Sequence, residues 1–114
     1  MEDCIFCKIA AGLIPCRKVY ENDLVLAFED IHPVAPVHVI IIPRKHIPTL
    51  MDVDEAGMAD LQAVMRAVQE VARIKKTDQS GFRVVINCNE AGGQVVFHLH
   101  VHLLGGGKLR DDLN

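Results

Sequence analysis

The amino-acid sequence predicts an α+β fold with a mostly antiparallel sheet, one long helix and a short N-terminal helix. Two observations lead to this prediction. Short segments rich in β-branched residues lie in both halves of the chain, as is typical of strands. Between them, one long segment repeats apolar residues at helical spacing. The order of strands, helix and strands favours an α+β arrangement over the regular alternation that builds a parallel sheet.

The first half of the chain is expected to contain one short helix and three strands. The helix covers residues 4–11 and is followed by Gly12, a residue type that often closes helices because it adopts left-handed backbone angles without strain. Short strands at residues 18–20 and 24–29 flank a turn-like triplet. The segment 37–42 is strongly β-branched and stops at a proline, as expected of a strand that ends there.

The long helix is expected to begin near Asp52 or Asp54. The spacing of Asp52 and Glu55 resembles a capping box, in which side chains satisfy free backbone amides of the first turn. Two further strands are predicted at residues 82–88 and 95–103. The apolar residues that recur at helical spacing are expected to face the core, and they are Met58, Leu61, Met65, Val68 and Ala72.

Length, charge and the start of the chain limit the classes of function. The chain has 114 residues, half of them hydrophobic, which suits one domain over residues 1–114. The net charge is −3 and the basic residues are dispersed, so we expect no nucleic-acid partner. The polar start predicts no signal peptide, and the longest apolar run, residues 39–42, is too short for a membrane. We therefore expect a cytoplasmic protein, for which a single nucleotide remains a possible ligand because backbone amides and histidines can hold one phosphate.

Three alternating histidines form the most informative segment of the sequence. In a strand, alternate side chains share a face about 6.6 Å apart, so His98, His100 and His102 are expected to line one face. Three imidazoles make a poor core face, because each buried ring nitrogen needs a partner. The outer two rings, about 13 Å apart, cannot both reach one metal ion. Phosphoryl chemistry therefore fits this segment better than a metal site does.

The middle histidine is the expected nucleophile. A neutral imidazole can attack phosphorus when a hydrogen bond holds its other nitrogen. His100 has a histidine on each side that could donate to the phosphoryl oxygens as charge builds. Just upstream, Gly92 and Gly93 let the backbone approach an anion closely, although a glycine pair alone is more often a simple turn.

Two cysteines near the start of the chain have metal-ligand spacing. Without an export signal, a metal site explains Cys4-x-x-Cys7 better than a disulfide does. Two thiolates are only half of a tetrahedral site, so a pair of buried free cysteines remains the alternative. Cys16 and Cys88 have no partner pattern, and we expect both to be structural.

The histidine segment resembles the signature of the histidine triad (HIT) family, in which histidines alternate with apolar residues. The residues that follow, Leu103-Leu104-Gly105-Gly106, are similar to those of the Hint branch, the histidine triad nucleotide-binding proteins. The likeness extends over almost the whole chain. Besides the triad, it rests on residues 4–9, 14–15, 27–31, 36–39, 42–46 and 92–94.

This resemblance implies a fold, an activity and a partner. The sheet would continue across a twofold axis into a homodimer with a nucleotide pocket in each subunit. The chain would be a hydrolase acting on P–N bonds, a purine nucleoside phosphoramidase that releases AMP from phosphoramidates or related nucleotidyl conjugates. His100 would form a nucleotidyl-histidine that water then hydrolyses. Alternatives are a dinucleoside polyphosphate hydrolase or nucleotidylyl transferase, and a non-catalytic nucleotide-binding interaction module.

The resemblance also implies roles for individual residues. His102 would contact the phosphate, while His38 and His98 would support the histidine network. Asp30 would accept hydrogen bonds from the ribose hydroxyls, unless it is a plain turn residue. The remaining nucleotide-binding residues would be Ile5, Phe6, Phe28 and Ile31 around the base and Asn87, Gly93 and Gln94 around the ribose and phosphate. Two of the apolar ones, Phe28 and Ile31, are explained equally well as core residues.

A structural zinc ion is the one cofactor that the resemblance implies, and no organic cofactor is expected. Its ligands would be Cys4, Cys7, His46 and His98. The sequence departs from the family at Val95, where many relatives carry a serine or threonine that can contact the phosphate or leaving group, so the chain loses one donor for the leaving group. The tail from residue 108 is short and charged, which leaves substrate specificity open.

Overall fold

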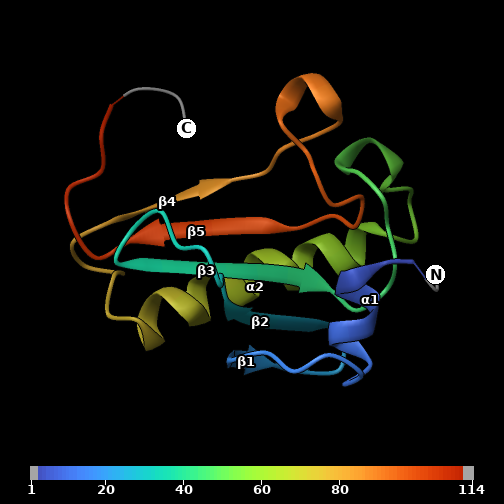
Figure 1. Ribbon diagram of the computed structural model, residues 1–114, viewed down its shortest axis with the longest axis horizontal. Coiled ribbons are helices and arrows are strands. Elements are labelled where there is room, and N and C mark those ends of the chain that lie inside the picture. The colour runs from blue at the N-terminus through green and yellow to red at the C-terminus, as the bar shows by residue number, and fades with distance from the viewer. Residues whose placement is uncertain (1–2, 112–114) are drawn as a thin grey trace.

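The computed structural model describes residues 3–111 and confirms the α+β prediction (Figure 1). Its sheet has five antiparallel strands in the order β1-β2-β3-β5-β4. The strands are β1 (Lys18–Glu21), β2 (Val25–Glu29), β3 (Val37–Pro43), β4 (Phe82–Val85) and β5 (Val101–Gly105). The helices are α1 (Ile5–Ala10) and α2 (Met58–Ile74), with short 3₁₀ turns at Leu50–Asp52 and Glu90–Gly92. No helix within residues 3–111 is long and apolar enough to cross a membrane.

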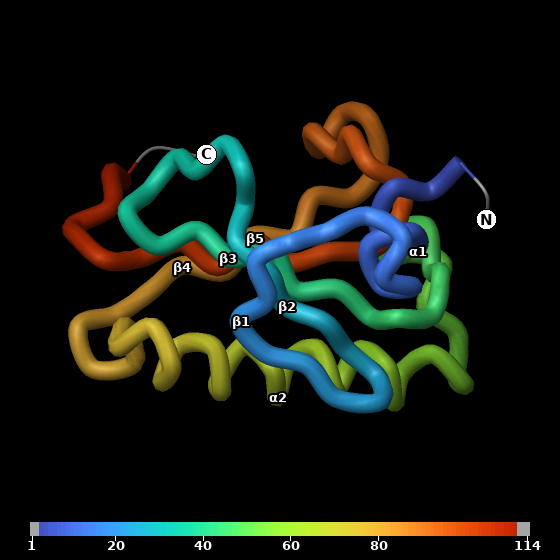
Figure 2. Tube along the Cα trace, turned by 60° about the horizontal axis from the view of Figure 1, so that its bottom comes forward, coloured from blue at the N-terminus to red at the C-terminus, as the bar shows by residue number. Residues whose placement is uncertain are grey.

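The two faces of the sheet are covered by different segments. Figure 2 shows α2 running along one face, while α1 and the loops that carry residues 30–36 and 90–97 lie on the other side. The side chains between α2 and the sheet form a buried cluster that includes Val39, Val68 and Val101. On the opposite face, Phe6 and Ile40 belong to a second buried cluster under α1. Alternate residues of the central strands serve the two clusters, as the period of a strand requires.

The short N-terminal helix agrees closely with its prediction. Cys4 is its N-cap, and the Cys4 Sγ accepts a hydrogen bond of 3.3 Å from the Cys7 backbone N–H. Gly12 follows the helix with φ +79°, the left-handed conformation expected of a closing glycine. Cys4 at the N-cap and Cys7 within the helix thus stand three residues apart at the start of α1, and α1 lies beside the end of β3 (Figure 1).

The predicted start of the long helix was wrong. Residues 50–52 form a 3₁₀ turn, because the Thr49 hydroxyl accepts from the Met51 N–H and donates to Asp52 at 2.7 Å. Asp52 is thus engaged before it can cap α2. Asp54 instead accepts from the Gly57 N–H at 2.8 Å, and α2 begins one residue later.

The core face of α2 was predicted only in part. Val68 and Ala72 are buried as expected, but Met58 and Met65 are 51% and 37% exposed and Leu61 is half-buried. The buried positions are Val64, Ala67, Val68, Val71 and Ala72. These small side chains let the helix lie close to the sheet, so the contact face is turned away from the larger methionines.

The last two strands are shorter than predicted. β4 ends at Val85, so Asn87 lies in the loop that follows it. β5 begins only at Val101, so His98 and His100 precede the strand, in contrast to the predicted strand over 95–103. The Leu99 N–H donates to the Ile47 carbonyl at 2.7 Å, a partner outside the sheet ladder. A main-chain contact with a distant loop thus replaces regular strand pairing here.

Candidate active site

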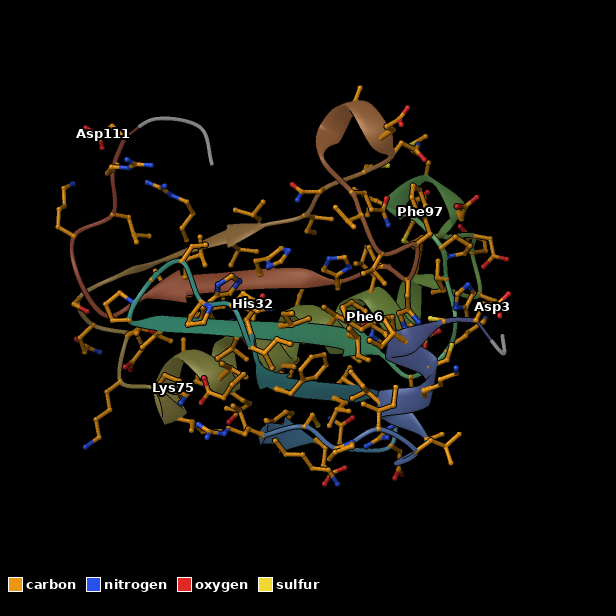
Figure 3. The ribbon with its side chains drawn as sticks, viewed as in Figure 1. Asp3, Phe6, His32, Lys75, Phe97 and Asp111 are labelled. Atoms are coloured by element: carbon orange, nitrogen blue, oxygen red, sulfur yellow. The ribbon has the colours of Figure 1, made fainter. Side chains whose placement is uncertain are left out.

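His100 is held in one tautomer by a single main-chain contact. Its ring is buried, and its Nδ1 lies 2.7 Å from the carbonyl oxygen of His98. Because a carbonyl only accepts hydrogen bonds, the proton of the neutral ring resides on Nδ1 and Nε2 carries a lone pair. Phe6, which reaches from α1 over the sheet in Figure 3, packs edge-on against this ring with centroids 5.0 Å apart. The ring is therefore oriented with a bare nitrogen, as a nucleophile requires.

His102 is held in the opposite tautomer by its neighbour His38. The Val34 N–H donates to His38 Nδ1 at 3.1 Å, so the proton of neutral His38 resides on Nε2. That nitrogen lies 3.0 Å from His102 Nδ1, which must then accept. The proton of His102 is left on Nε2. The rings of His100 and His102 have centroids 5.0 Å apart, so a bare nitrogen and an N–H donor sit side by side.

The register of the sheet explains why His38 and His102 meet. His38 on β3 is opposite Leu104 on β5, and His102 lies two residues away along the same face of β5. Such diagonal pairs are within reach of long side chains across an antiparallel ladder. The predicted role of His38 as support for the triad thus has a geometric basis in strand pairing.

His38 and the three histidines of the triad are neutral near pH 7. Burial lowers the pKa of His38, His98 and His100, and it lowers the pKa of His102 to about 4. For His102 the neighbouring His100 and His38 rings lower the pKa further, while the carboxylate of Asp30 opposes the shift. Neutral imidazoles are what a nucleophile and an uncharged hydrogen-bond donor need.

The predicted nucleotide-binding residues lie on the same side of the sheet as the histidines but differ in exposure. Asn87 lines a cavity of about 210 Å³ together with His38 and His102. Phe6 and Phe28 are buried and pack edge-on, with centroids 5.7 Å apart. The two isoleucines predicted for the base pocket, Ile5 and Ile31, are 46% and 85% exposed.

Gln94 and Gly93 hold the loop that precedes the histidines. The side chain of Gln94 is buried and bonds only to backbone, donating to the carbonyls of Pro48 and Val96 and accepting from the Asn89 N–H. A contact of this side chain with nucleotide stays a prediction. Gly93 has φ +89° and lies beside Asn87, whose amide nitrogen would be 3.9 Å from an added Cβ.

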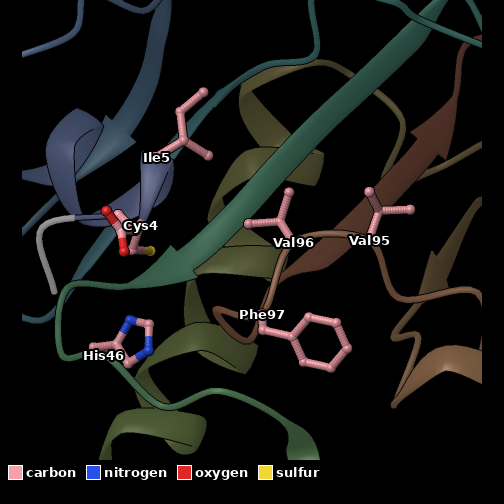
Figure 4. A pocket seen from close by; sticks show the side chains of 7 residues that line it. Cys4, Ile5, His46, Val95, Val96 and Phe97 are labelled. Carbon is pink, nitrogen blue, oxygen red and sulfur yellow. The ribbon is translucent and has the colours of Figure 1, made fainter.

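An apolar cavity lies next to the histidine loop. It has a volume of about 540 Å³, and its lining includes Ile5, Val95 and Phe97, as Figure 4 shows. The Val95 side chain is 87% exposed, so the residue that departs from the family pattern meets solvent or ligand rather than core. The wall of the cavity therefore has no hydroxyl at position 95.

The metal-ligand candidates Cys4, Cys7, His46 and His98 come together at one end of the site. One ligand atom from each lies within 4.8 Å of the other three. His98 donates from Nε2 to the Pro43 carbonyl at 2.8 Å, which leaves Nδ1 bare and facing the thiols. The Cys4 Sγ is 3.3 Å from His98 Nδ1, close to the roughly 3.5 Å between sulfur and nitrogen ligands of tetrahedral zinc. The donor set and spacing fit a zinc ion.

A second group of potential ligands, Asp30, His38 and His102, does not suit a metal as well. Their ligand atoms also lie within 4.8 Å of one another. A metal on His38 Nε2 would require the ring proton on Nδ1, but that nitrogen already accepts the Val34 N–H. The hydrogen bonds therefore favour a proton-ordered network at this end of the site.

Main-chain groups are the functional partners that sequence reasoning missed. The carbonyls of Pro43 and His98 and the N–H of Val34 set the tautomers of three histidines. No residue type signals them, because every residue carries the same backbone groups. Only the path of the chain identifies which amide or carbonyl faces a given ring.

Fold and site together define a class of α+β protein in which neutral histidines and a thiol-histidine cluster meet on one face of an antiparallel sheet. The HIT domain family matches the chain over residues 11–109. Purine nucleoside phosphoramidase of Escherichia coli K12 is 43% identical over 108 residues, which are 95% of this chain and 91% of that protein. HitA of Neisseria gonorrhoeae is 42% identical over 105 residues, 92% of this chain and 97% of that protein.

Solved structures agree with this assignment. A histidine triad protein from Clostridium difficile has a TM-score of 0.95 and 48% identity, covering 99% of this chain and 98% of its own. A HIT family hydrolase from Legionella pneumophila Philadelphia 1 has a TM-score of 0.92 and 43% identity, covering 96% and 97%. The chain belongs to the HIT family.

Proposed function

We propose that the chain hydrolyses purine nucleoside phosphoramidates or related nucleotidyl conjugates and releases the nucleoside monophosphate, AMP in the adenosine case. The observation that carries the proposal is the pair of opposite tautomers, with the bare Nε2 of His100 beside the N–H of His102. The similarity to a protein named purine nucleoside phosphoramidase supports the choice of a P–N bond.

The reaction would proceed in two steps. His100 Nε2 attacks the α-phosphorus and the P–N bond breaks, with the leaving nitrogen taking up a proton from solvent to depart as an amine. His102 donates a hydrogen bond to a phosphoryl oxygen as negative charge builds there. Water then attacks the nucleotidyl-histidine, releases the nucleoside monophosphate and restores His100.

The nucleotide would lie along the histidine face. Asp30 would accept from the ribose hydroxyls, and Asn87 with the Gly93 backbone would line the phosphate side. The base would pack on the aromatic pair and the exposed isoleucines, a combination of apolar surface and few polar groups that suits a purine. The complete set proposed for the nucleotide is Ile5, Phe6, Phe28, Asp30, Ile31, Asn87, Gly93, Gln94, His100 and His102.

The decisive experiment measures AMP release from an adenosine phosphoramidate by the wild type and by His100→Asn. We expect turnover to vanish in the variant while AMP binding persists. His32→Asn is the matched control, because His32 lies on the same side of the sheet but its side chain is exposed and makes no hydrogen bond in the structure. Undiminished turnover in His100→Asn would refute the mechanism. A dinucleoside polyphosphate assayed in parallel tests the alternative substrate class.

The proposal includes a structural zinc ion held by Cys4, Cys7, His46 and His98. When bound, zinc would supply a rigid tetrahedral link and no reaction step. The link would join α1, the loop after β3 and the segment that leads into β5. Burial and the Cys4 thiol raise the pKa of Cys7, so formation of its thiolate would depend on the metal.

A homodimer formed through β4 is also part of the proposal. Within the described residues, β4 pairs only with β5, so its other edge has free backbone groups. Phe82 and Val84 on this strand are 37% and 38% exposed, and Met65 on α2 is 37% exposed. Pairing of two β4 strands would continue the sheet and cover apolar surface.

A cytoplasmic location, where nucleotides and reduced thiols are available, completes the proposal.

A further inference from the structure

The loop after β2 holds both ring nitrogens of His38. The Val34 N–H donates to His38 Nδ1 at 3.1 Å, and Asp30 Oδ2 lies 3.3 Å from His38 Nε2. The other oxygen of Asp30 accepts from the His32 N–H at 2.7 Å, which keeps the loop in a turn. The Asp30 backbone N–H also donates to the His38 carbonyl. One short loop thus fixes both the position and the tautomer of one imidazole.

The carboxylate of Asp30 reinforces the proton on His38 Nε2. A carboxylate has no proton to donate and carries negative charge, so at 3.3 Å from Nε2 it favours a proton on that nitrogen over a lone pair. An asparagine at this position could present a donor to the same nitrogen. That arrangement requires the ring proton on Nδ1, where it would face the Val34 N–H. Loss of the carboxylate therefore weakens the tautomer that the loop otherwise imposes.

The tautomer of His38 determines the tautomer of His102. With a proton on His38 Nε2, the His102 Nδ1 at 3.0 Å must accept, and His102 Nε2 carries a proton toward the substrate. If His38 turned or lost this proton, His102 could carry its proton on Nδ1, as His100 does. The lone pair on His102 Nε2 would then face a phosphoryl oxygen, and the two electron-rich atoms would repel each other.

We propose that Asp30 is a positioning residue for His102, acting through His38, in addition to the ribose contact that the proposed function assigns to it. The carboxylate then has two tasks, ribose recognition and selection of the donor tautomer. Both its oxygens have acceptor capacity left beyond these contacts, because a carboxylate offers about four lone-pair sites. This inference rests on the proposed function for its kinetic test but not for its spectroscopic one.

The two tasks separate when the ribose hydroxyls are removed. The kinetic experiment compares an adenosine phosphoramidate with its 2′,3′-dideoxy counterpart, using the wild type, Asp30→Asn and Asp30→Ser. Serine can keep the turn hydrogen bond to His32 while removing the carboxylate. On the dideoxy substrate, where no ribose hydroxyl is present, we expect kcat to fall about 10²-fold in both variants, the scale seen for a lost transition-state donor or a wrong tautomer. Asp23→Asn, at an exposed turn, is the charge-matched control that leaves kcat unchanged.

The spectroscopic experiment reads the tautomer itself. In ¹⁵N-histidine-labelled protein, wild-type His102 should show a protonated Nε2 and an unprotonated Nδ1, and the two Asp30 variants should shift this population toward the other tautomer. Equal kcat of wild type and Asp30→Asn on the dideoxy substrate would overturn the proposal, and so would an unchanged His102 tautomer in the variants. If wild-type turnover proved independent of His100, the proposed function would fail, and the NMR result alone would still decide the role of Asp30.

Discussion

The two ends of the histidine triad carry the same residue in very different surroundings. At one end, His98 directs a bare Nδ1 toward two thiols and donates to a main-chain carbonyl. At the other end, His102 accepts from His38 and keeps its proton for the open side of the site. The two residues are four positions apart in one sequence pattern. The comparison teaches that the group facing one ring nitrogen of a histidine decides whether the other nitrogen offers a lone pair or an N–H.

The largest expected effect tests the donor end. His102→Asn should lower kcat about 10²- to 10³-fold, because it removes a hydrogen-bond donor that acts in the transition state. The zinc content should not change, since His102 is not among the proposed ligands. Steady-state kinetics and metal analysis of the same preparation check both statements. A variant that kept its kcat, or lost its metal, would break the division between the two ends.

The thiol end should respond in the opposite way. In the double variant Cys4→Ser and Cys7→Ser we expect loss of zinc and a fall in Tm of about 10 °C, equivalent to roughly 2 kcal/mol for a domain of this size. Cys16→Ser, which removes a half-buried thiol outside the cluster, should keep the zinc. Elemental analysis and thermal unfolding are the measurements. If wild-type protein purified without added zinc contains none, and the double variant has an unchanged Tm, the metal site is refuted.

The neutral state of His102 predicts a pH dependence of stability. Its pKa in the fold is about 4, against 6.5 in the unfolded chain. Between these values the unfolded chain binds a proton that the folded chain does not, so stability falls as the pH is lowered from about 6.5 toward 4 and is flat above. The lowered pKa of His38 acts in the same direction. Thermal unfolding from pH 7.5 to 4.5 should therefore show a smaller decline in His102→Asn than in the wild type. Parallel curves would contradict the prediction.

The smallest expected effect concerns the residue that departs from the family. Val95→Ser restores a hydroxyl at an exposed position on the wall of the apolar cavity. One additional hydrogen bond of about 1 kcal/mol would raise kcat/KM about fivefold for a substrate with a polar leaving group. A substrate with an apolar leaving group should gain nothing. Val34→Ser, on the loop near His38, is a control in which the backbone N–H contact is kept and no such gain is expected.

The sequence predicted the elements better than their ends. The left-handed glycine after α1 and the β-branched run of β3 were identified correctly, because these signals are local. The start of α2 was missed because Thr49 competes for Asp52, a contact that a capping pattern does not reveal. The buried face of α2 was assigned correctly at Val68 and Ala72 but also to larger side chains, whereas close approach to the sheet selected only valine and alanine.

In the candidate site too, the sequence predicted what depends on neighbouring positions and missed what depends on distant ones. Alternation of histidines and the spacing of Cys4 and Cys7 indicated phosphoryl chemistry and half of a metal site from the residues themselves. His46 and His98 entered as ligands only through resemblance to a family, since 39 positions separate Cys7 from His46. A pattern along the chain cannot report such distances, because they depend on how strands and loops pack.

The sequence by itself determined which chemical groups this protein has and the order of its strands and helices, because periodicity and residue type are properties of neighbouring positions. Tertiary structure decided what each histidine does. The rings of His98 and His102 have their proton-placing partners, the Pro43 carbonyl and the His38 ring, on segments remote in sequence, and the pairing of β3 with β5 brings His38 and His102 together. Hydrogen-bond partners are set by three-dimensional distance, and so the division of roles within the triad appears only in the folded chain.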